Sequence, residues 1–331
     1  MSFNLVQLNN KSGFIVGAIV RGESLDLLDV SVYELALEAA NNNVSIASII
    51  ESHKTQEVIN YDDAINSGNI IAPISHPESH KQILSGTGLT HLGSAAPRSK
   101  MHSTVESNSV KDQLTDTERM FQLGVEGGKG SLSDPGVAPE WFYKGTGESV
   151  NNPFSTITMP DFSLDAGEEA ELAGIYIIND SGKIFRVGYT LANEFSDHVT
   201  EKQNYLYLAH SKLRNCSFGP EILIDDLPTE VTGTVTLKRD GENYWQRDFL
   251  SGEKHMCHSI ANLEYHHFKY DQFRVPGQLH IHFFGAAVLS FSDGVKIQEG
   301  DEITIQCDFM TRPLKNGVGI LKQSELNITK L

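Results

Sequence analysis

One segment, residues 167–201, limits the possible folds of this chain more than any other. It begins with Glu169-Ala170-Glu171, continues as an apolar, β-branched run, and then reaches Asn179-Asp180-Ser181-Gly182. Asn, Asp, Ser and Gly in succession are typical of a tight turn. The residues that follow, Ile184–Ala192, predict a second strand. We therefore expect an antiparallel hairpin, and the rest of the chain must pack around it.

The hairpin brings three carboxylates together. Side chains two apart in a strand share one face, so Glu169 and Glu171 lie side by side. A two-residue loop at Ser181-Gly182 would pair Glu171 with Ala192 and Glu169 with Glu194. A different loop length shifts this register by a residue or two, and in each of these registers Glu194 arrives near the other two glutamates.

Clustered carboxylates raise one another's pKa unless a cation compensates. A bound divalent ion is the simplest compensation. Oxygen-only ligation favours Mg²⁺, with Mn²⁺ or Ca²⁺ as alternatives. The other interpretation is an acidic, solvated strand end without a metal ion. Spacing alone favours that interpretation, because Glu-x-Glu is a common sequence.

Strand-like segments dominate the chain after about residue 155, whereas the first 70 or so residues predict short strands followed by a helix. Strands are expected over Phe3–Leu8, Gly13–Val20, Leu25–Leu28, Ala173–Ile178, Gly233–Lys238, Tyr244–Phe249, Gln278–Phe284, Ala287–Phe291 and Glu302–Asp308. Helices are expected over Val32–Ala40, Met101–Phe121 and Ser259–Phe268, and a flexible loop over Gly124–Gly136. The pattern predicts an α+β fold with a small N-terminal domain over residues 1–80 and a larger domain over residues 81–331.

Charge and cysteine content exclude several classes of function. The chain has 26 Lys and Arg against 43 Asp and Glu, a net charge of −17, which repels nucleic-acid phosphates. Its apolar runs fall short of the ~20 residues of a membrane span, and its first residues do not resemble a signal peptide. The distant cysteines Cys216, Cys257 and Cys307 predict buried free thiols. We expect a cytoplasmic protein that acts on a small molecule, without nucleic-acid or membrane partners.

The hairpin sequence also resembles a known signature. Glu169–Ala173 (EAELA) and Gly188–Glu194 (GYTLANE) are similar to the metal-site motif of the fumarylacetoacetate hydrolase superfamily. Further similar motifs follow in the order of that family: Pro139–Gly145, Ser211-Lys212 ahead of Gly219-Pro220, Pro276-Gly277 through Gly285, and Glu299-Gly300-Asp301. The resemblance covers roughly residues 80–320. It implies a mixed β-sandwich or rolled β-barrel catalytic domain behind the small N-terminal domain.

The resemblance implies roles for particular residues. Glu169, Glu171 and Glu194 would be the metal ligands, although the third ligand of the family is usually Asp. Lys212 would lie beside the metal as a catalytic residue. Lys144 and Gly285 would contact substrate, and Ala286-Ala287 stands where the family usually has Thr. Family members are usually homodimers, and we expect the same here.

Residues 86–98 indicate a branch of the superfamily. Hydrolases usually carry Glu three residues after a histidine, whereas Ser94 follows His91 at that spacing. The segment instead resembles the Gly-x-Thr-x-x-x-Ser-x-x-x-Arg element of the sugar-acid dehydratases. The matching residues are Gly88, Thr90, Ser94 and Arg98.

That branch removes water from 2-keto-3-deoxy sugar acids, typically pentonates, through a metal-stabilised enolate that leads to 2-oxoglutarate semialdehyde. The resemblance implies Ser94 as a catalytic residue and Thr90 and Arg98 as substrate-binding residues. His91 is either an acid–base group or a buried structural histidine. Arg98 suits a bidentate contact with a carboxylate.

Three alternatives remain open from the sequence. The enzyme could instead hydrolyse a C–C bond of a 2,4-diketo acid. The chain could also bind a metal and a 2-oxo acid without catalysis. Finally, His280 and His282 share one strand face and could hold a second metal, although barrel-lining histidines are commoner.

Overall fold

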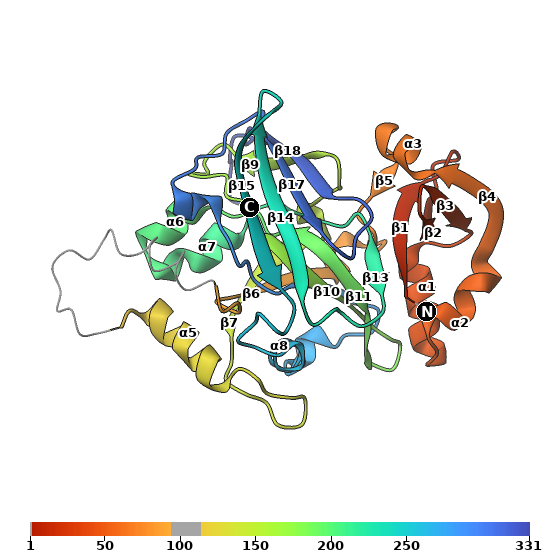
Figure 1. The fold of residues 1–331 in the computed structure, drawn as a ribbon, viewed down its shortest axis with the longest axis horizontal. Coiled ribbons are helices and arrows are strands. Elements are labelled where there is room, and N and C mark those ends of the chain that lie inside the picture. The colour runs from red at the N-terminus through yellow and green to blue at the C-terminus, as the bar shows by residue number, and fades with distance from the viewer. Residues whose placement is uncertain (1, 94–113) are drawn as a thin grey trace.

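The computed structural model describes residues 2–93 and 114–331, and Figure 1 shows their arrangement. The strands of this part of the chain form a thirteen-stranded sheet and a five-stranded sheet. Strands of the larger sheet follow the order β4-β3-β2-β1-β13-β11-β10-β16-β6-β7, with β5, β8 and β12 paired at its side. The smaller sheet has the order β15-β14-β17-β18-β9. This mixture of helices and two sheets agrees with the α+β class expected from the sequence.

The strands of the larger sheet are β1 (Phe3–Asn9), β2 (Ile15–Arg21), β3 (Ser24–Leu28), β4 (Lys54–Asn60), β5 (Ile70–Ile71), β6 (Gln82–Gly88), β7 (Glu140–Thr146), β8 (Val150–Asn151), β10 (Ala170–Ile178), β11 (Ile184–Asn193), β12 (Cys216–Phe218), β13 (Ile222–Ile224) and β16 (Leu279–Phe283). Those of the smaller sheet are β9 (Thr156–Pro160), β14 (Val231–Arg239), β15 (Glu242–Ser251), β17 (Glu302–Cys307) and β18 (Leu314–Leu321). The α-helices of the described residues are α1 (Val32–Asn42), α2 (Ile46–Ile49), α3 (Tyr61–Asn66), α5 (Asp116–Gly127), α6 (His198–Gln203), α7 (Leu208–Lys212) and α8 (Ile260–Phe268).

Helix α1 shows why the N-terminal segment folds as predicted. Ser31 and Glu34 form a capping box at its start, and Asn43 ends it in the left-handed conformation at φ 54°. Its apolar face, including Leu35 and Ala39, packs in a core shared with β10, β11 and β16. The helix therefore joins the N-terminal segment to the central sheet.

The N-terminal strands are continuous with the larger sheet, because β1 pairs with β13 from Phe3↔Ile224 to Leu5↔Ile222. In Figure 1 these strands and α1–α3 lie together at one end of the molecule, while α6 and α7 lie at the other. The division into domains at residue 80 stays a prediction. The smaller sheet packs on the other face of the β10–β11 hairpin through a second core that includes Leu172, Leu191 and Val235.

The β10–β11 hairpin has the predicted register at its open end, where Glu171 pairs with Ala192. The turn itself differs from the prediction. The backbone N–H of Asn179 donates to the carbonyl of Lys183 at 2.9 Å, which closes a three-residue loop rather than a two-residue one. A β-bulge at Val187 adds one residue to β11. This extra residue offsets the extra loop residue, so Glu171 still pairs with Ala192.

Two other predictions need correction. Residues 287–291 do not form a strand, and a 3₁₀ helix occupies Ser290–Asp293. The carboxylate of Glu168 binds both the backbone N–H and the hydroxyl of Ser290, which provides polar contacts for an irregular segment. The helix predicted over Met101–Phe121 is present from Asp116 onward and runs to Gly127, and residues 101–113 lie outside the described part.

The glycine-rich segment predicted as a flexible loop is anchored to α8. Asn262 accepts a hydrogen bond from the backbone N–H of Gly136 at 2.8 Å and donates to the carbonyl of Val137 at 2.9 Å. His266 contacts the carbonyl of Gly136 at 2.9 Å. Side-chain contacts from a rigid helix thus hold a backbone that composition alone marks as mobile.

The three cysteines are buried and free, as predicted. Every helix in the described part of the chain is too short or too polar to span a membrane.

Candidate metal centre

Three buried glutamates meet at the open end of the hairpin. Glu169 precedes β10, Glu171 lies within it, and Glu194 follows β11. Their exposed fractions are 2%, 2% and 0%, and one oxygen of each lies within 4.8 Å of the others. The two-residue period of the strand puts Glu169 and Glu171 on one face, and the hairpin register brings Glu194 beside them. The described residues contain no second cluster of this kind.

Lys212, at the end of α7, lies between two of these carboxylates. Its Nζ contacts Oε1 of Glu169 and donates to Oε2 of Glu194 at 2.7 Å. It also donates to the Ser196 hydroxyl at 3.2 Å. The ammonium lies 4.9 Å from the centre of the Phe142 ring, whose face favours a cation. Lys212 is fully buried, so its charge is stabilised by these groups rather than by water.

Lys144, from β7, holds the other oxygen of Glu194. Its Nζ forms an ion pair with Oε1 of Glu194 at 2.6 Å. It also donates to the backbone carbonyls of Phe195 at 2.8 Å and Lys212 at 3.0 Å. These acceptors account for all three donors of an ammonium group. The predicted contact of Lys144 with substrate stays a prediction.

Glu171 is the least compensated of the three carboxylates. Its Oε2 accepts a hydrogen bond from the backbone N–H of Gly285 at 2.7 Å, while its Oε1 has no hydrogen-bond partner among the described residues. Burial raises the pKa of Glu171 well above its ordinary value, and the charges of Glu194 and Glu169 raise it further. Among the described residues, one buried oxygen of Glu171 has no hydrogen-bond partner, and the possible ligand atoms of the cluster are all carboxylate oxygens, a donor set that fits a hard divalent cation.

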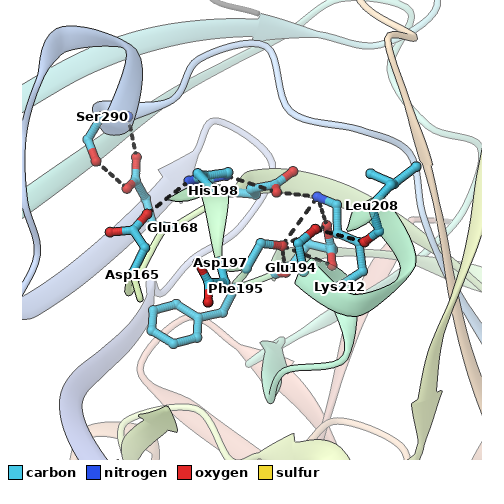
Figure 2. A network of polar contacts seen from close by, with 12 residues as sticks. Asp165, Glu168, Glu194, Phe195, Asp197, His198, Leu208, Lys212 and Ser290 are labelled. Carbon is cyan, nitrogen blue, oxygen red and sulfur yellow. Dashed lines mark hydrogen bonds and ion pairs between the residues drawn. The ribbon is translucent and has the colours of Figure 1, made fainter. Parts of the chain in front are cut away.

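His198, the first residue of α6, extends the network away from Lys212, as Figure 2 shows. Its Nε2 lies 3.1 Å from Oε1 of Glu169, and its Nδ1 lies 3.6 Å from Oδ2 of Asp165. Burial lowers the pKa of this imidazole, but the two carboxylates outweigh burial and raise the pKa to about 10. His198 is therefore a cation that orients Glu169.

Two acidic residues beside this network have structural partners. Asp197 forms an ion pair with Arg214 at 2.8 Å and accepts the backbone N–H of Thr200 at 2.9 Å, which caps α6. Glu168 is bound by Ser290, and burial raises its pKa to about 7. Sequence reasoning did not assign Asp165, Glu168 or His198. Their proximity to Glu169 and Glu194 along the chain was the available signal.

The remaining predicted residues lie next to Gly285 or outside the described residues. The Thr90 hydroxyl contacts the carbonyl of Phe284 and lies 3.1 Å from Nδ1 of His91. Nε2 of His91 lies 2.8 Å from the Ser251 hydroxyl. Burial, followed by the charge of His255, lowers the pKa of His91 to about 4. Ser94 and Arg98 fall within residues 94–113, outside the described part of the chain.

His280 and His282 lie in a group of buried rings rather than in a second metal site. Nδ1 of His280 lies 3.0 Å from Nε2 of His267, and Nδ1 of His282 lies 2.8 Å from the Ser85 hydroxyl. The rings of His267 and His282 stack at 4.7 Å between centroids. These contacts give the two histidines buried structural partners, and the predicted barrel lining stays a prediction.

Comparisons with known proteins place this geometry in context. No protein-family model matches the chain. A stretch of 115 residues is 32% identical to 2-dehydro-3-deoxy-D-arabinonate dehydratase of Saccharolobus solfataricus. That stretch is 33% of this chain and 37% of the dehydratase, so the match spans little more than a third of the relative.

Two solved structures share the fold over nearly the whole chain. A 2-keto-3-deoxy-D-arabinonate dehydratase complexed with magnesium and 2,5-dioxopentanoate has a TM-score of 0.69 at 19% identity, with 97% of this chain and 100% of that chain covered. The fumarylacetoacetate hydrolase of Exiguobacterium antarcticum has a TM-score of 0.56 at 15% identity, with 96% and 100% covered. The resemblance predicted from the sequence is therefore found in two forms: a third of the chain is similar in sequence to a sugar-acid dehydratase, and the fold is shared with a sugar-acid dehydratase and a fumarylacetoacetate hydrolase.

Proposed function

We propose that this chain is a metal-dependent hydro-lyase that removes one water from a 2-keto-3-deoxy sugar acid, a pentonate, in sugar-acid catabolism. The observation that carries the proposal is the buried cluster of Glu169, Glu171 and Glu194, in which one oxygen of Glu171 has no hydrogen-bond partner among the described residues. The dehydratase with the same fold, complexed with magnesium and 2,5-dioxopentanoate, supports both the ion and the substrate class.

Glu169, Glu171 and Glu194 would hold the ion, with Mg²⁺ as the first choice and Mn²⁺ or Ca²⁺ as alternatives. When bound, such an ion supplies positive charge that polarises the 2-oxo group of the substrate. Gly285 and His198 would orient two of the ligands, since each contacts a carboxylate oxygen directly. The short distances within the cluster support this assignment, since one oxygen of each carboxylate lies within 4.8 Å of the others.

The dehydration itself breaks a C–H bond at C3 and the C–O bond at C4, and the proton and hydroxyl leave as water. Lys212 is our first choice for stabilising the charge that develops when the C3 proton is removed, or for moving a proton at Nζ. Its position between Glu169 and Glu194 supports this role. His91 and Ser94 are the further candidates for proton transfer.

Thr90, Arg98, Lys144 and Gly285 are the proposed substrate-binding residues. Thr90 and Gly285 adjoin each other, because a Cβ added to Gly285 would lie 2.3 Å from Oγ1 of Thr90. Gly285 in turn contacts Glu171, so Thr90 lies near the carboxylate cluster. We further propose that the enzyme is a cytoplasmic homodimer, as the resemblance implies.

Hydrolysis of a C–C bond in a 2,4-diketo acid is the second candidate function. A fumarylacetoacetate hydrolase shares the fold, which favours this possibility. Against it, Ser94 occupies the position at which hydrolases usually carry Glu.

Mass spectrometry of a mixed-substrate incubation distinguishes the two functions. The Mg²⁺-loaded protein is incubated with D- and L-2-keto-3-deoxypentonates and hexonates together with several 2,4-diketo acids. Loss of one water from a keto-deoxy acid, abolished by EDTA, is the expected result. Cleavage of a diketo acid into two acids, with a gain of water, would establish the hydrolase instead.

Metal binding is measured separately from turnover. Glu171→Gln should weaken Mn²⁺ binding, followed by electron paramagnetic resonance, by at least about a hundredfold, since a charged ligand is lost. Glu168→Gln is the matched control, because Glu168 is equally buried but is bound to Ser290. Equal Mn²⁺ affinity of Glu171→Gln and the unchanged protein would refute the assignment.

A further inference from the structure

A cavity lies at the turn end of the β10–β11 hairpin, opposite the carboxylate cluster. It has a volume of about 640 Å³ and lies between the turn of the hairpin, helix α8 and Leu132 of the loop after α5. That loop passes close to α8 in Figure 1. The volume falls within the range of about 300–1,000 Å³ that is typical of small-molecule sites.

This cavity is separate from the carboxylate cluster. Tyr176, which lines it, lies five residues beyond Glu171 on the same strand. At about 3.3 Å per residue, the two positions are about 17 Å apart along β10. None of the three glutamates lines the cavity.

The walls of the cavity are strongly positive for a chain of this charge. Of the described residues, four cations line it, Lys183, Arg186, Lys269 and Arg274, against one carboxylate, Glu264. The chain as a whole carries −17, so this concentration of positive charge opposes the overall field. An anion would meet attraction here and repulsion over much of the remaining surface.

Two of these cations have acidic partners and two do not. Arg186 pairs with Glu264 at 2.5 Å, and Arg274 contacts the carboxylate of Asp271. Lys183 has no ion-pair partner among the described residues. Within the described part of the chain, the Lys269 ammonium contacts Nδ1 of His266 at 3.1 Å and the ring of Tyr270, neither of which is acidic. Lys183 and Lys269 therefore have donors available for a ligand.

The rest of the lining is apolar and aromatic. It includes Phe185, Tyr265 and Phe268, and Leu132 at the rim is 61% exposed. Tyr176 is buried there, and its hydroxyl interacts with the carboxylate of Glu264. Aromatic walls with a few convergent polar groups suit a ring that carries an anionic substituent.

We propose that this cavity binds a small organic anion that joins an aromatic ring to a phosphate or carboxylate group. The ring lies against Tyr265 and Phe268, and the anionic group lies between Lys183 and Lys269. The cavity and the carboxylate cluster lie at opposite ends of the β10–β11 hairpin, and no glutamate of the cluster lines the cavity. The site is therefore distinct from the proposed catalytic site.

Calorimetric titration of the full-length protein tests the proposal, with EDTA present to keep divalent ions from the carboxylate cluster. The probes are adenosine 5′-monophosphate, for the phosphate, and indole-3-acetate, for the carboxylate. Saturable binding of either probe is expected, and the tighter one identifies the anionic group. Adenosine should bind at least about tenfold more weakly than its monophosphate, because it lacks the charge.

The double variant Lys183→Ala/Lys269→Ala should weaken binding at least about tenfold. The matched control Lys322→Ala/Lys330→Ala removes the same charge from the exposed C-terminal segment and should leave binding unchanged. Glu171→Gln should also bind the probe normally. Loss of binding in Glu171→Gln would show that the probe binds at the carboxylate cluster and would overturn the proposal.

Two other outcomes would overturn it. One is the absence of saturable binding of both probes at millimolar concentration. The other is a dimer, measured by light scattering, that the substitution Ile184→Asp at the cavity rim converts to monomer. In that case the surface around the cavity is an interface between two copies of the chain.

Discussion

The backbone N–H of Gly285 donates a hydrogen bond to Oε2 of Glu171 at 2.7 Å, although the two residues are 114 positions apart. Gly285 follows β16, which pairs with β10 on the side opposite β11. Among residues 2–93 and 114–331, this is the only hydrogen bond to the Glu171 carboxylate. The orientation of that carboxylate therefore depends on the path of the backbone at residue 285.

Gly285→Ala should disturb this contact. Gly285 has φ +100°, and an added Cβ would lie 2.3 Å from Oγ1 of Thr90 and 2.8 Å from the carbonyl oxygen of Thr87. We expect a loss of about 3 kcal/mol in the free energy of unfolding from strain and overpacking together. Urea denaturation and Mn²⁺ titration check the loss of stability and of metal affinity.

Gly294→Ala is the control, because Gly294 has φ +75° with no atom near its missing Cβ. The free energy of unfolding of this variant should fall by only about 1–2 kcal/mol, and its metal affinity should not change. Equal metal affinities of the two variants would contradict a role for Gly285 in orienting Glu171.

Lys212→Met should increase the dependence of stability on divalent ions. The substitution removes the ammonium that contacts Glu169 and Glu194, so these buried carboxylates repel each other without a cation between them. In the absence of metal, we expect the free energy of unfolding to fall by about 3–5 kcal/mol. The rise in melting temperature on adding Mg²⁺ should then be larger than in the unchanged protein, as measured by differential scanning calorimetry.

Lys11→Met provides the comparison, since Lys11 is an exposed lysine with one distant partner at 3.6 Å. Its melting temperature and Mg²⁺ response should match those of the unchanged protein. If Mg²⁺ raised the melting temperature of Lys212→Met no more than that of the unchanged protein, Lys212 would not be part of the ion site.

The buried histidines should make the protein sensitive to acid. Burial lowers the pKa of His267 from its ordinary 6.5 to about 3 and that of His280 well below its ordinary value. The native state therefore binds fewer protons than the unfolded state below pH 6.5. Their contribution to stability is complete above about pH 6.5 and is lost as the pH falls toward 3.

The free energy of unfolding should fall less steeply with falling pH in His280→Gln than in the unchanged protein. The difference in slope should be up to about 1.4 kcal/mol per pH unit between pH 6 and 4. The measurement is the slope of the unfolding free energy against pH, from urea denaturation. The exposed His80, replaced by Gln in the same way, should leave the slope unchanged. A slope in His280→Gln equal to that of the unchanged protein would show that His280 is protonated in the native state.

Asn262→Ala should release the loop after α5. Asn262 makes two hydrogen bonds to that loop, each worth about 1 kcal/mol. We expect trypsin to cleave after the exposed Lys129 about tenfold faster in this variant. Gln122→Ala, which removes an exposed contact within α5, should not change the rate. Rapid cleavage of the unchanged protein would instead indicate a loop that opens freely.

Much of the candidate site could be predicted because it is local. Glu169, Glu171 and Glu194 lie on one hairpin, and the two-residue period of a strand with antiparallel pairing is enough to bring them together. The details of the turn were less predictable. The loop is one residue longer than expected, and the bulge at Val187 restores the register. A bulge depends on how the strand packs, which the order of residues along one strand does not encode.

The strand predicted over Ala287–Phe291 shows the opposite case. Its apolar residues have strand propensity, but Ser290 binds Glu168, more than 100 positions earlier in the chain. Tertiary contacts outweighed local preference there, as they often do for short apolar segments.

The sequence by itself determined the hairpin, the convergence of its three glutamates and the resemblance that points to a 2-oxo acid. The tertiary structure alone decided which groups surround those glutamates. Lys144 arrives from β7, Lys212 from α7 and Gly285 from the end of β16. A pattern of two or three residues fixes neighbours along a strand or helix, whereas the charges that compensate a buried carboxylate can come from any segment that packing brings within about 3 Å.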